Sequence, residues 1–485
     1  MWKNAEILNF KEGHYLSIGK ICRFFCPFLT LGHQFGNKDE DLIYGQSLIA
    51  QNEPQTFLYI MRTKPIFRLI ATAITALTAC NSFALPARPG LLRVSQSDGT
   101  AIDLRLIGDE RFHYALAADG MPLLEKDGIY YYAALSDDGK PLVSNIKASE
   151  GMPYDSEMQR RVIECLEKQR MHSYQLYNNR CKMIGSEPGN LRFGDYVTSG
   201  SPKVLVVLVE FEDVSFNTPN PKEYFKRMLS EEGFSDYGAA GSVLDYLQLN
   251  SAGQFTPQFE VVGPVKVSGK VEDYGVNNLF GGGEPFAHNA VAEACSLIDD
   301  ETDFSLFDNN SNGIIDGVYV IHAGEGEATG GNPNAIWPHT SWFSVLETQQ
   351  FVYDGVMLDT YSISNEISDG RPEGNGVFIH EFSHMLGLPD IYTSNKSTFT
   401  PGPWSVLDMG PYLNERRNPP LYSAFERYAL GWLEPKILAE PDIIRLPSLA
   451  ENEACCVKAD EEEIYWFENR QKIGWDAYLP GHGML

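Results

Sequence analysis

Positively charged side chains are scarce in this chain. Its 485 residues include 38 lysines and arginines against 65 aspartates and glutamates, which gives a formal net charge of −27 at pH 7. Such an excess of negative charge repels phosphate groups and anionic headgroups, so it argues against nucleic acid and anionic membrane surfaces as partners. A hydrophobic content of 43% and an aromatic content of 12% are typical of a well-packed globular protein.

Cysteine is also sparse, and its spacing argues against two kinds of site. Five cysteines remain once the first 84 residues are set aside: Cys165, Cys181, Cys295, Cys455 and Cys456. This odd number matches no zinc ribbon and requires no disulfide framework. We expect buried thiols, and the alternative is a thiol of Cys165 or Cys181 that caps a metal.

The apolar run near the start of the chain, Leu69–Ala79, is too short to span a bilayer. Three basic residues precede it: Arg62, Lys64 and Arg68. Small residues, Ser82 and Ala84, follow it at the positions that a signal peptidase reads. The pattern predicts a signal peptide over residues 61–84 with cleavage before Leu85. The mature protein would then be secreted or on the cell surface, without a transmembrane span.

A second processing signal overlaps the first. The segment Leu77-Thr-Ala-Cys80 resembles a bacterial lipobox, which would make Cys80 a lipidated N-terminus and a membrane anchor. The sequence leaves both alternatives open. Residues 1–60 show no clean periodicity, and we interpret them as an over-extended start or as a disordered leader.

The motif with the clearest chemistry is His-Glu-Phe-Ser-His-Met-Leu-Gly-Leu-Pro-Asp, residues 380–390. On a helix, His380 and His384 share one face and can reach one metal ion, with Glu381 placed as general base. Gly387 allows a sharp exit from the helix, which would bring Asp390 back as a third ligand. Three protein ligands leave a fourth position for water, as in a catalytic zinc site.

This stretch resembles the zinc site of metzincin-type metallopeptidases, in the immune inhibitor A-like family (M6), where an aspartate fits the third ligand position. Five further segments resemble the family: Lys203–Asp213, Asp245–Phe255, Val320–Glu327, Trp337–His339 and Pro420–Pro435. The resemblance covers roughly residues 200–485. It implies an α+β fold with a twisted sheet and an active-site helix. It also implies that the chain, which stops at a family strand beginning near Gly481, is truncated at its C-terminus.

Ahead of that region, residues 85–150 predict a small β-rich N-terminal domain, because short apolar runs alternate with Gly and Asp turns. The expected strands are Leu91–Val94, Ile102–Ile107, Phe112–Ala117 and Ile129–Ala134. In a secreted protease such a domain can be a propeptide. Residues 151–202 predict a helix, over Met158–Met183, and an exposed linker. Residues 203–485 would form the zinc metallopeptidase domain.

Metzincins carry a methionine in a turn beneath the metal, and the matching segment here is Trp404–Gly410. The methionine position holds Leu407, and Met409 lies two residues later, so the identity of this residue stays open. Just after the turn, Tyr412 is a candidate donor to the oxyanion, with simple packing as the alternative.

A second motif predicts calcium. The segment from Asp308 to Asp316 matches Asp-x-Asn-x-Asn-Gly-x-x-Asp. Five groups at this spacing can surround Ca²⁺: Asp308, Asn310, Asn312, the carbonyl of Ile314, and Asp316. The alternative is a turn rich in Asx residues that binds no metal. Calcium here would brace the loop rather than take part in chemistry.

Together these patterns predict a secreted zinc endopeptidase that acts on protein or peptide substrates. Two other classes of function remain: a non-catalytic, calcium-dependent surface or adhesion module on a protease-like scaffold, and a zinc hydrolase for substrates other than peptides. The presence of Glu381 favours catalysis, because metal binding alone does not require it.

Overall fold

The computed structural model describes residues 83–136, 139–150, 156–178, 196–277, 286–330, 332–346, 350–392, 399–440, 443–458 and 463–485. The predictions for residues 1–60, for Cys80 and Cys181, for most of the signal peptide and for most of the linker lie outside these ranges. The chain divides into two compact units. The second, Thr75–Val457 with Trp466–Leu485, holds the elements that bear on the candidate site.

The central element is a seven-stranded sheet with the order β1-β11-β14-β10-β8-β9, to which β15 adds beside β14. Its strands are β1 (Phe83–Ala84), β8 (Lys203–Glu210), β9 (Gln258–Lys266), β10 (Val318–Glu325), β11 (His339–Trp342), β14 (Thr360–Ser368) and β15 (Arg371–Pro372). Strands β9, β8, β10 and β14 are mutually parallel, whereas β11 runs antiparallel to β14 and β1 runs antiparallel to β11. A run of six buried residues in β8 explains its central place, because a parallel strand is covered on both faces.

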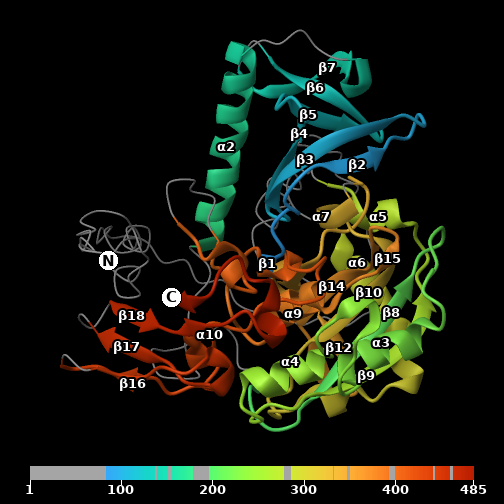
Figure 1. Ribbon diagram of the computed structural model, residues 1–485. Helices are drawn as coiled ribbons and strands as arrows, with labels where there is room; N and C mark the ends of the chain where they lie inside the picture. The colour runs from blue at the N-terminus through green and yellow to red at the C-terminus, as the bar shows by residue number, and fades with distance from the viewer. Residues whose placement is uncertain are drawn as a thin grey trace, which may run out of the picture. The chain divides into compact units, whose positions relative to one another are not determined.

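Successive residues of β8 enter two different cores, as the alternation of side chains in a strand requires. Val204, Val206 and Leu208 join one core, together with Phe378 and Phe382 of helix α9 (Asn375–Met385). The neighbouring residues of β8 join a second core that includes helix α6 (Ala287–Ile298). Helices therefore cover both faces of the sheet (Figure 1). Helix α9 packs on one face and helix α6 packs on the other.

The remaining α-helices are short, apart from α2. They are α2 (Ser156–Asn178), α3 (Pro221–Ser230), α4 (Val243–Asn250), α5 (Val271–Gly275), α7 (Glu327–Gly330), α8 (Phe343–Leu346) and α10 (Ala424–Ala429). The expected helix at Met158–Met183 corresponds to α2, which begins at Ser156. Among the described residues, no helix is long and apolar enough to cross a bilayer.

Residues 92–147 form a six-stranded antiparallel sheet in sequence order. Its strands are β2 (Leu92–Ser95), β3 (Ala101–Asp109), β4 (Phe112–Ala117), β5 (Pro122–Lys126), β6 (Ile129–Leu135) and β7 (Pro141–Lys147). All four runs expected from the sequence are strands, while β5 and β7 were not expected. We call this element the N-terminal sheet. Its core also includes Trp337 and Val377, so it packs directly on the part of the chain that carries α9.

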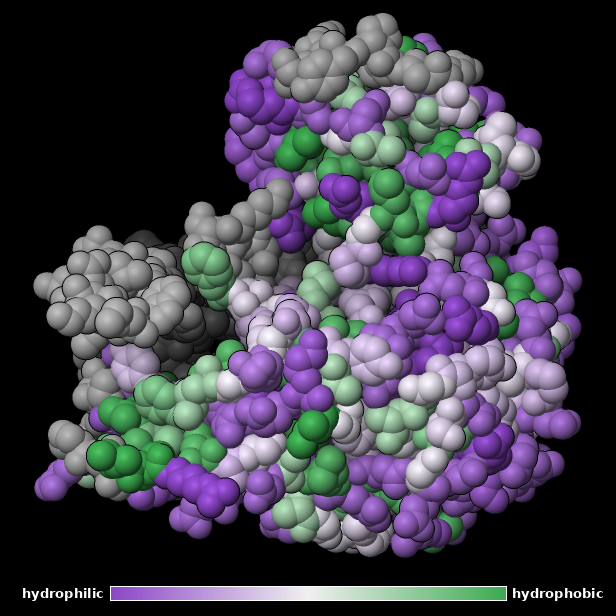
Figure 2. Space-filling view, viewed as in Figure 1, coloured by the Kyte–Doolittle hydropathy of each residue, from purple (hydrophilic) through white to green (hydrophobic). Residues whose placement is uncertain are grey.

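Short strands complete the fold. They are the hairpin β12 (Phe351–Tyr353) and β13 (Val356–Leu358), the sheet of β16 (Lys436–Ile437), β17 (Cys455–Lys458) and β18 (Ile464–Phe467), and the pair β19 (Asn469–Arg470) and β20 (Gly483–Met484). Cys295, Cys455 and Cys456 are buried, as expected, whereas Cys165 on α2 is only half-buried, so the expectation was wrong there. On the face shown in Figure 2, hydrophilic residues predominate at the lower right of the molecule.

Candidate metal centre

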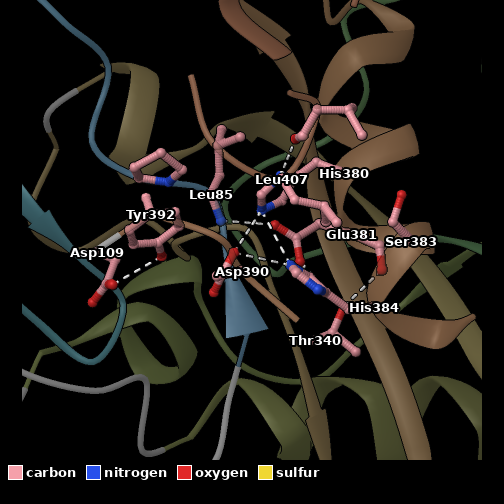
Figure 3. Close-up of polar contacts among 12 residues, drawn as sticks. Leu85, Asp109, Thr340, His380, Glu381, Ser383, His384, Asp390, Tyr392 and Leu407 are labelled. Atoms are coloured by element: carbon pink, nitrogen blue, oxygen red, sulfur yellow. Dashed lines mark hydrogen bonds and ion pairs between the residues drawn. The ribbon is translucent and has the colours of Figure 1, made fainter. Parts of the chain in front are cut away.

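Helix α9 brings the two predicted histidine ligands together. His380 and His384 are one turn apart, and both are buried. Their Nε2 atoms lie 3.2 Å from each other (Figure 3). The helix begins at Asn375, five residues before the motif, so that His380 and His384 are held on a regular turn rather than at a frayed end.

A glycine turn then returns the chain to the same point. Gly387 has φ of 93°, a left-handed conformation that disfavours any side chain. Its N–H donates to the carbonyl of His384, and the N–H of Leu388 donates to that of Ser383, which closes the helix end. Asp390 follows, with its Oδ1 atom 3.5 Å from His380 Nε2 and 3.3 Å from His384 Nε2.

The tautomers of the two histidines follow from their other ring nitrogens. His380 Nδ1 lies 2.7 Å from the carbonyl oxygen of Val406, and His384 Nδ1 lies 2.7 Å from that of Leu388. A carbonyl oxygen only accepts, so each Nδ1 carries the proton and each neutral ring turns a lone pair on Nε2 toward the other. Three electron-pair donors, including Asp390 Oδ1, therefore converge on one point.

This donor set fits zinc. Bonds of about 2.1 Å in a tetrahedron place ligand atoms roughly 3.4 Å apart. The three atoms lie 3.2, 3.3 and 3.5 Å from one another, close to that spacing. Among the described residues, the side chains of His, Cys, Asp or Glu that gather closely enough to hold a metal are His380, Glu381 and His384, within 4.8 Å of one another. Asp390 lies outside that group, yet its Oδ1 is the atom that faces both Nε2 atoms.

The pKa values of the same groups show that the nearby carboxylates favour positive charge at this point. Burial opposes protonation of His380, but the carboxylates of Asp390 and Glu381 outweigh it and raise its pKa to about 9. Burial lowers the pKa of His384. Burial also opposes ionisation of Asp390, yet His384, His380 and Arg111 hold the pKa of Asp390 below its usual value.

Glu381 lies beside the donor set, with both carboxylate oxygens already engaged. Oε2 accepts from the hydroxyl of Thr340 on β11 at 3.1 Å, and Oε1 accepts from the N–H of Leu85 at 3.1 Å. Burial raises the pKa of Glu381 to about 8, against the opposing effect of His380. A buried carboxyl with a pKa in this range can take up and release a proton near neutral pH.

The chain just before the N-terminal sheet runs through the site. Strand β1 extends the central sheet at β11, pairing Ala84 with His339. Beyond it, the carbonyl of Leu85 accepts from Trp337 Nε1 at 2.8 Å, and the carbonyl of Pro86 accepts from the Tyr412 hydroxyl at 2.5 Å. Leu85 is fully buried. The segment from Phe83 to Pro86 therefore lies alongside β11 and next to Glu381 of α9. The sequence alone did not indicate these contacts of Leu85, Trp337 and Tyr412.

A buried ion-pair cluster links the N-terminal sheet to Asp390. Arg111, in the turn between β3 and β4, places Nη2 3.2 Å from Asp390 Oδ2 and 2.7 Å from the Tyr392 hydroxyl. Asp109 binds the same guanidinium through one oxygen, 3.1 Å from Nε and 2.6 Å from Nη2. Nothing in the sequence pattern indicated this cluster, because 279 residues separate Arg111 from Asp390.

The turn beneath the histidines contains Leu407. Val406 accepts from His380, and the carbonyl of Leu407 accepts from Ile391 at 3.1 Å, which ties the turn to the segment that carries Asp390. Leu407 is fully buried in the core, while Met409 is half-buried and outside that core. Leucine therefore fills the apolar position that the resemblance assigns to methionine.

The predicted calcium loop is curled by its own side chains. Asp308 accepts from the N–H groups of Asn312 and Gly313, and Asn312 accepts from the N–H of Ile314. Asp316, at the far end, accepts from Asn309. The loop leads into β10, which begins at Val318. Such bonds also occur in metal-free Asx turns, so they leave both readings open.

Known proteins with similar sequences carry the kind of function that this geometry indicates. The family described as "Immune inhibitor A peptidase M6, catalytic domain" matches residues 194–434. Immune inhibitor A from Bacillus thuringiensis subsp. alesti is 30% identical over 253 residues, which cover 43% of this chain and 36% of that protein. Pre-pro-metalloprotease PrtV from Vibrio cholerae serotype O1 (strain M66-2) is 24% identical over 250 residues, covering 43% of this chain and 27% of PrtV.

The matched stretch thus spans about a third of the length of these relatives. The family match contains every residue of the converging donor set, and it begins nine residues before β8 of the central sheet. Through residues 194–434, the chain belongs to the immune inhibitor A family of metallopeptidases, M6.

Proposed function

We propose that this chain is the peptidase part of a secreted or surface-located, zinc-dependent endopeptidase of the metzincin type. The observation that carries the proposal is the convergence of His380 Nε2, His384 Nε2 and Asp390 Oδ1, with Glu381 alongside. Glu381 is assigned as base rather than ligand because Thr340 and Leu85 already donate to its two oxygens, whereas Asp390 Oδ1 faces both histidines.

Each residue has a defined role in peptide hydrolysis. His380, His384 and Asp390 would hold zinc, which supplies Lewis-acid polarisation of a water and of the scissile carbonyl. Glu381 takes the proton of the attacking water and passes it to the leaving amine. Thr340 orients the Glu381 carboxylate from β11. Tyr412 is the proposed additional donor to the developing oxyanion, since its hydroxyl already donates to a peptide carbonyl.

The substrates are expected to be peptides in extended form. Strand β11 lies next to α9 and pairs with β1 in this structure, and β1 belongs to the predicted signal peptide. Removal of that peptide would leave β11 at the edge of the central sheet, with backbone groups to offer to an added strand. The same arrangement supports a propeptide role for residues 85–150, because the segment entering the N-terminal sheet occupies the approach to Glu381.

Limited proteolysis tests the propeptide role. Cleavage within residues 185–202, followed by separation of the N-terminal piece, should raise peptidase activity because the approach to Glu381 becomes open. Activity would be measured on a mixed peptide library before and after cleavage. Equal activity of the intact and the cleaved chain would contradict a propeptide.

The substitution Glu381→Gln tests catalysis itself. Hydrolysis should fall by at least about 100-fold, because the proton acceptor is lost, while zinc stays bound in a 1:1 ratio. Glu325→Gln, at the exposed end of β10, is the matched control and should keep full activity. Zinc binding without hydrolysis in the activated parent would favour the adhesion module, and hydrolysis only of non-peptide substrates would favour another zinc hydrolase.

We also propose that calcium binds the loop Asp308–Asp316, supported by the spacing of its oxygen donors. Calcium at 100 times its dissociation constant should stabilise the fold by about 2.7 kcal/mol and raise the melting temperature. Asp308→Ala should abolish that rise, whereas Asp303→Ala, which removes a nearby helix cap, should keep it. A melting temperature that ignores calcium in the parent would contradict the site.

A further inference from the structure

The two oxygens of Asp390 face different partners. Oδ1 points at His380 and His384, where a metal would bind, and Oδ2 lies 3.2 Å from Arg111 Nη2. The side chain of Asp390 is 3% exposed and that of Arg111 is 1% exposed. A guanidinium bound to Oδ2 leaves Oδ1 as the oxygen available to a metal and fixes the carboxylate plane.

Arg111 is itself held in place from several sides. Asp109 binds its Nε and Nη2 atoms, the Tyr392 hydroxyl accepts from Nη2, and the guanidinium lies 5.5 Å from the centre of the Tyr392 ring. Tyr392 in turn donates to Asp109 at 2.9 Å. Glu110 lies farther away, 3.6 Å from Arg111 Nε. The cluster thus presents one well-oriented cation to Asp390.

We propose that Arg111, supplied by the N-terminal sheet, is a positioning residue for the metal ligand Asp390. This inference rests on the proposed zinc site. Partners that hydrogen-bond to a metal ligand orient it, and their loss typically costs 10- to 100-fold in metal affinity. Because Asp390 follows the glycine turn and has few other side-chain partners among the described residues, Arg111 determines its orientation.

The metal and the N-terminal sheet share one carboxylate, each through a different oxygen. If Arg111 strengthens metal binding, metal binding must strengthen docking of the N-terminal sheet by the same factor. The sheet would therefore hold the ligand set together in the newly folded protein.

The test is a zinc titration of the full chain, in competition with a chromophoric chelator, on the parent and three variants. Arg111→Gln removes the cation. Arg111→Lys keeps a charge but not the planar fork, so it should recover part of the affinity. Arg88→Gln is the matched control, because Arg88 joins the same side of the interface to Asp369 at 2.7 Å without touching a ligand.

We expect Arg111→Gln to weaken zinc binding by 10- to 100-fold, Arg111→Lys to weaken it less, and Arg88→Gln to leave it unchanged. The visible absorption of bound Co²⁺, which reports ligand geometry, should change in Arg111→Gln alone. Equal or tighter zinc binding by Arg111→Gln, or the same loss in Arg88→Gln, would overturn the inference while leaving the zinc site intact. Failure of the parent to bind zinc would overturn the proposed function and this inference together. If Arg111→Gln does not fold, Arg111→Lys decides between these outcomes.

Discussion

At the scale of single residues, the candidate base is set by two neighbours that do not belong to its motif. Thr340 comes from β11 and donates to Glu381 Oε2, which favours the ionised carboxylate and lowers its pKa. Burial acts in the opposite direction and is the larger effect. The reactivity of Glu381 thus depends on a hydroxyl contributed by β11.

Thr340→Val keeps the shape of the side chain and removes that hydroxyl. Losing a hydrogen bond to the charged form raises the pKa of Glu381, so the acid limb of the pH profile of kcat/KM should move to higher pH. The profile would be measured after release of the N-terminal segment. Thr329→Val is the matched control, because the buried Thr329 hydroxyl pairs with Ser368 at 2.7 Å rather than with Glu381 or Thr340. An unmoved acid limb in Thr340→Val would exclude this role.

At the scale of elements, the ligand set depends on how α9 ends. Two histidines on one helical face follow from spacing alone, but the third ligand requires the chain to reverse within a few residues. Gly387 makes this possible through its left-handed backbone. Hydrogen bonds from the N–H groups of Gly387 and Leu388 to the last turn then fix the direction of the segment that carries Asp390.

Gly387→Ala should destabilise the fold by about 1–2 kcal/mol, because a side chain strains the left-handed conformation. It should also weaken zinc binding, since relief of that strain moves Asp390. Gly370→Ala is the matched control: Gly370 also has a positive φ, 69°, with open space around it, in a turn away from the ligands. Denaturant unfolding and zinc titration give the two readouts. Zinc affinity that is equal in the two variants would contradict the positional role of Gly387.

At the scale of the whole molecule, the fold buries neutral histidines in its core. His322 on β10 and His339 on β11 are almost wholly inaccessible. Burial lowers the pKa of His322 to about 4 and that of His339 to about 4, from 6.5 for an exposed histidine. The unfolded chain therefore binds more protons than the folded one between these values, and folding stability must fall as the pH falls through this window.

When the pH falls from 6.5 to 4, each of these histidines should lower the free energy of unfolding by about 3 kcal/mol. The prediction can be checked by urea unfolding in metal-free buffer at several pH values. His322→Gln should flatten the dependence by about one proton. Stability that stays constant or rises as the pH falls would contradict it. The contribution of His113 to the pH dependence of folding stability has the opposite sign, because Glu327 and other partners outweigh burial and raise the pKa of His113.

Much of the candidate site was predictable, because its residues are close in sequence and helical spacing alone places two of them together. Strands β5 and β7 were missed because their burial is irregular and only neighbouring strands define them. The remaining contacts of the site, from Leu85, Arg111, Thr340 and Trp337, join residues far apart in the chain.

By itself, the sequence determined the metal-binding motif, the base beside it and the family, because these reside in local spacing and in residue type. The tertiary structure alone decided which strand supports Glu381, which segment occupies its approach, and which cation faces Asp390. Those pairings span up to 296 residues, and no local pattern encodes them. They arise when two sheets share one apolar core, which brings their polar turns together at the end of α9.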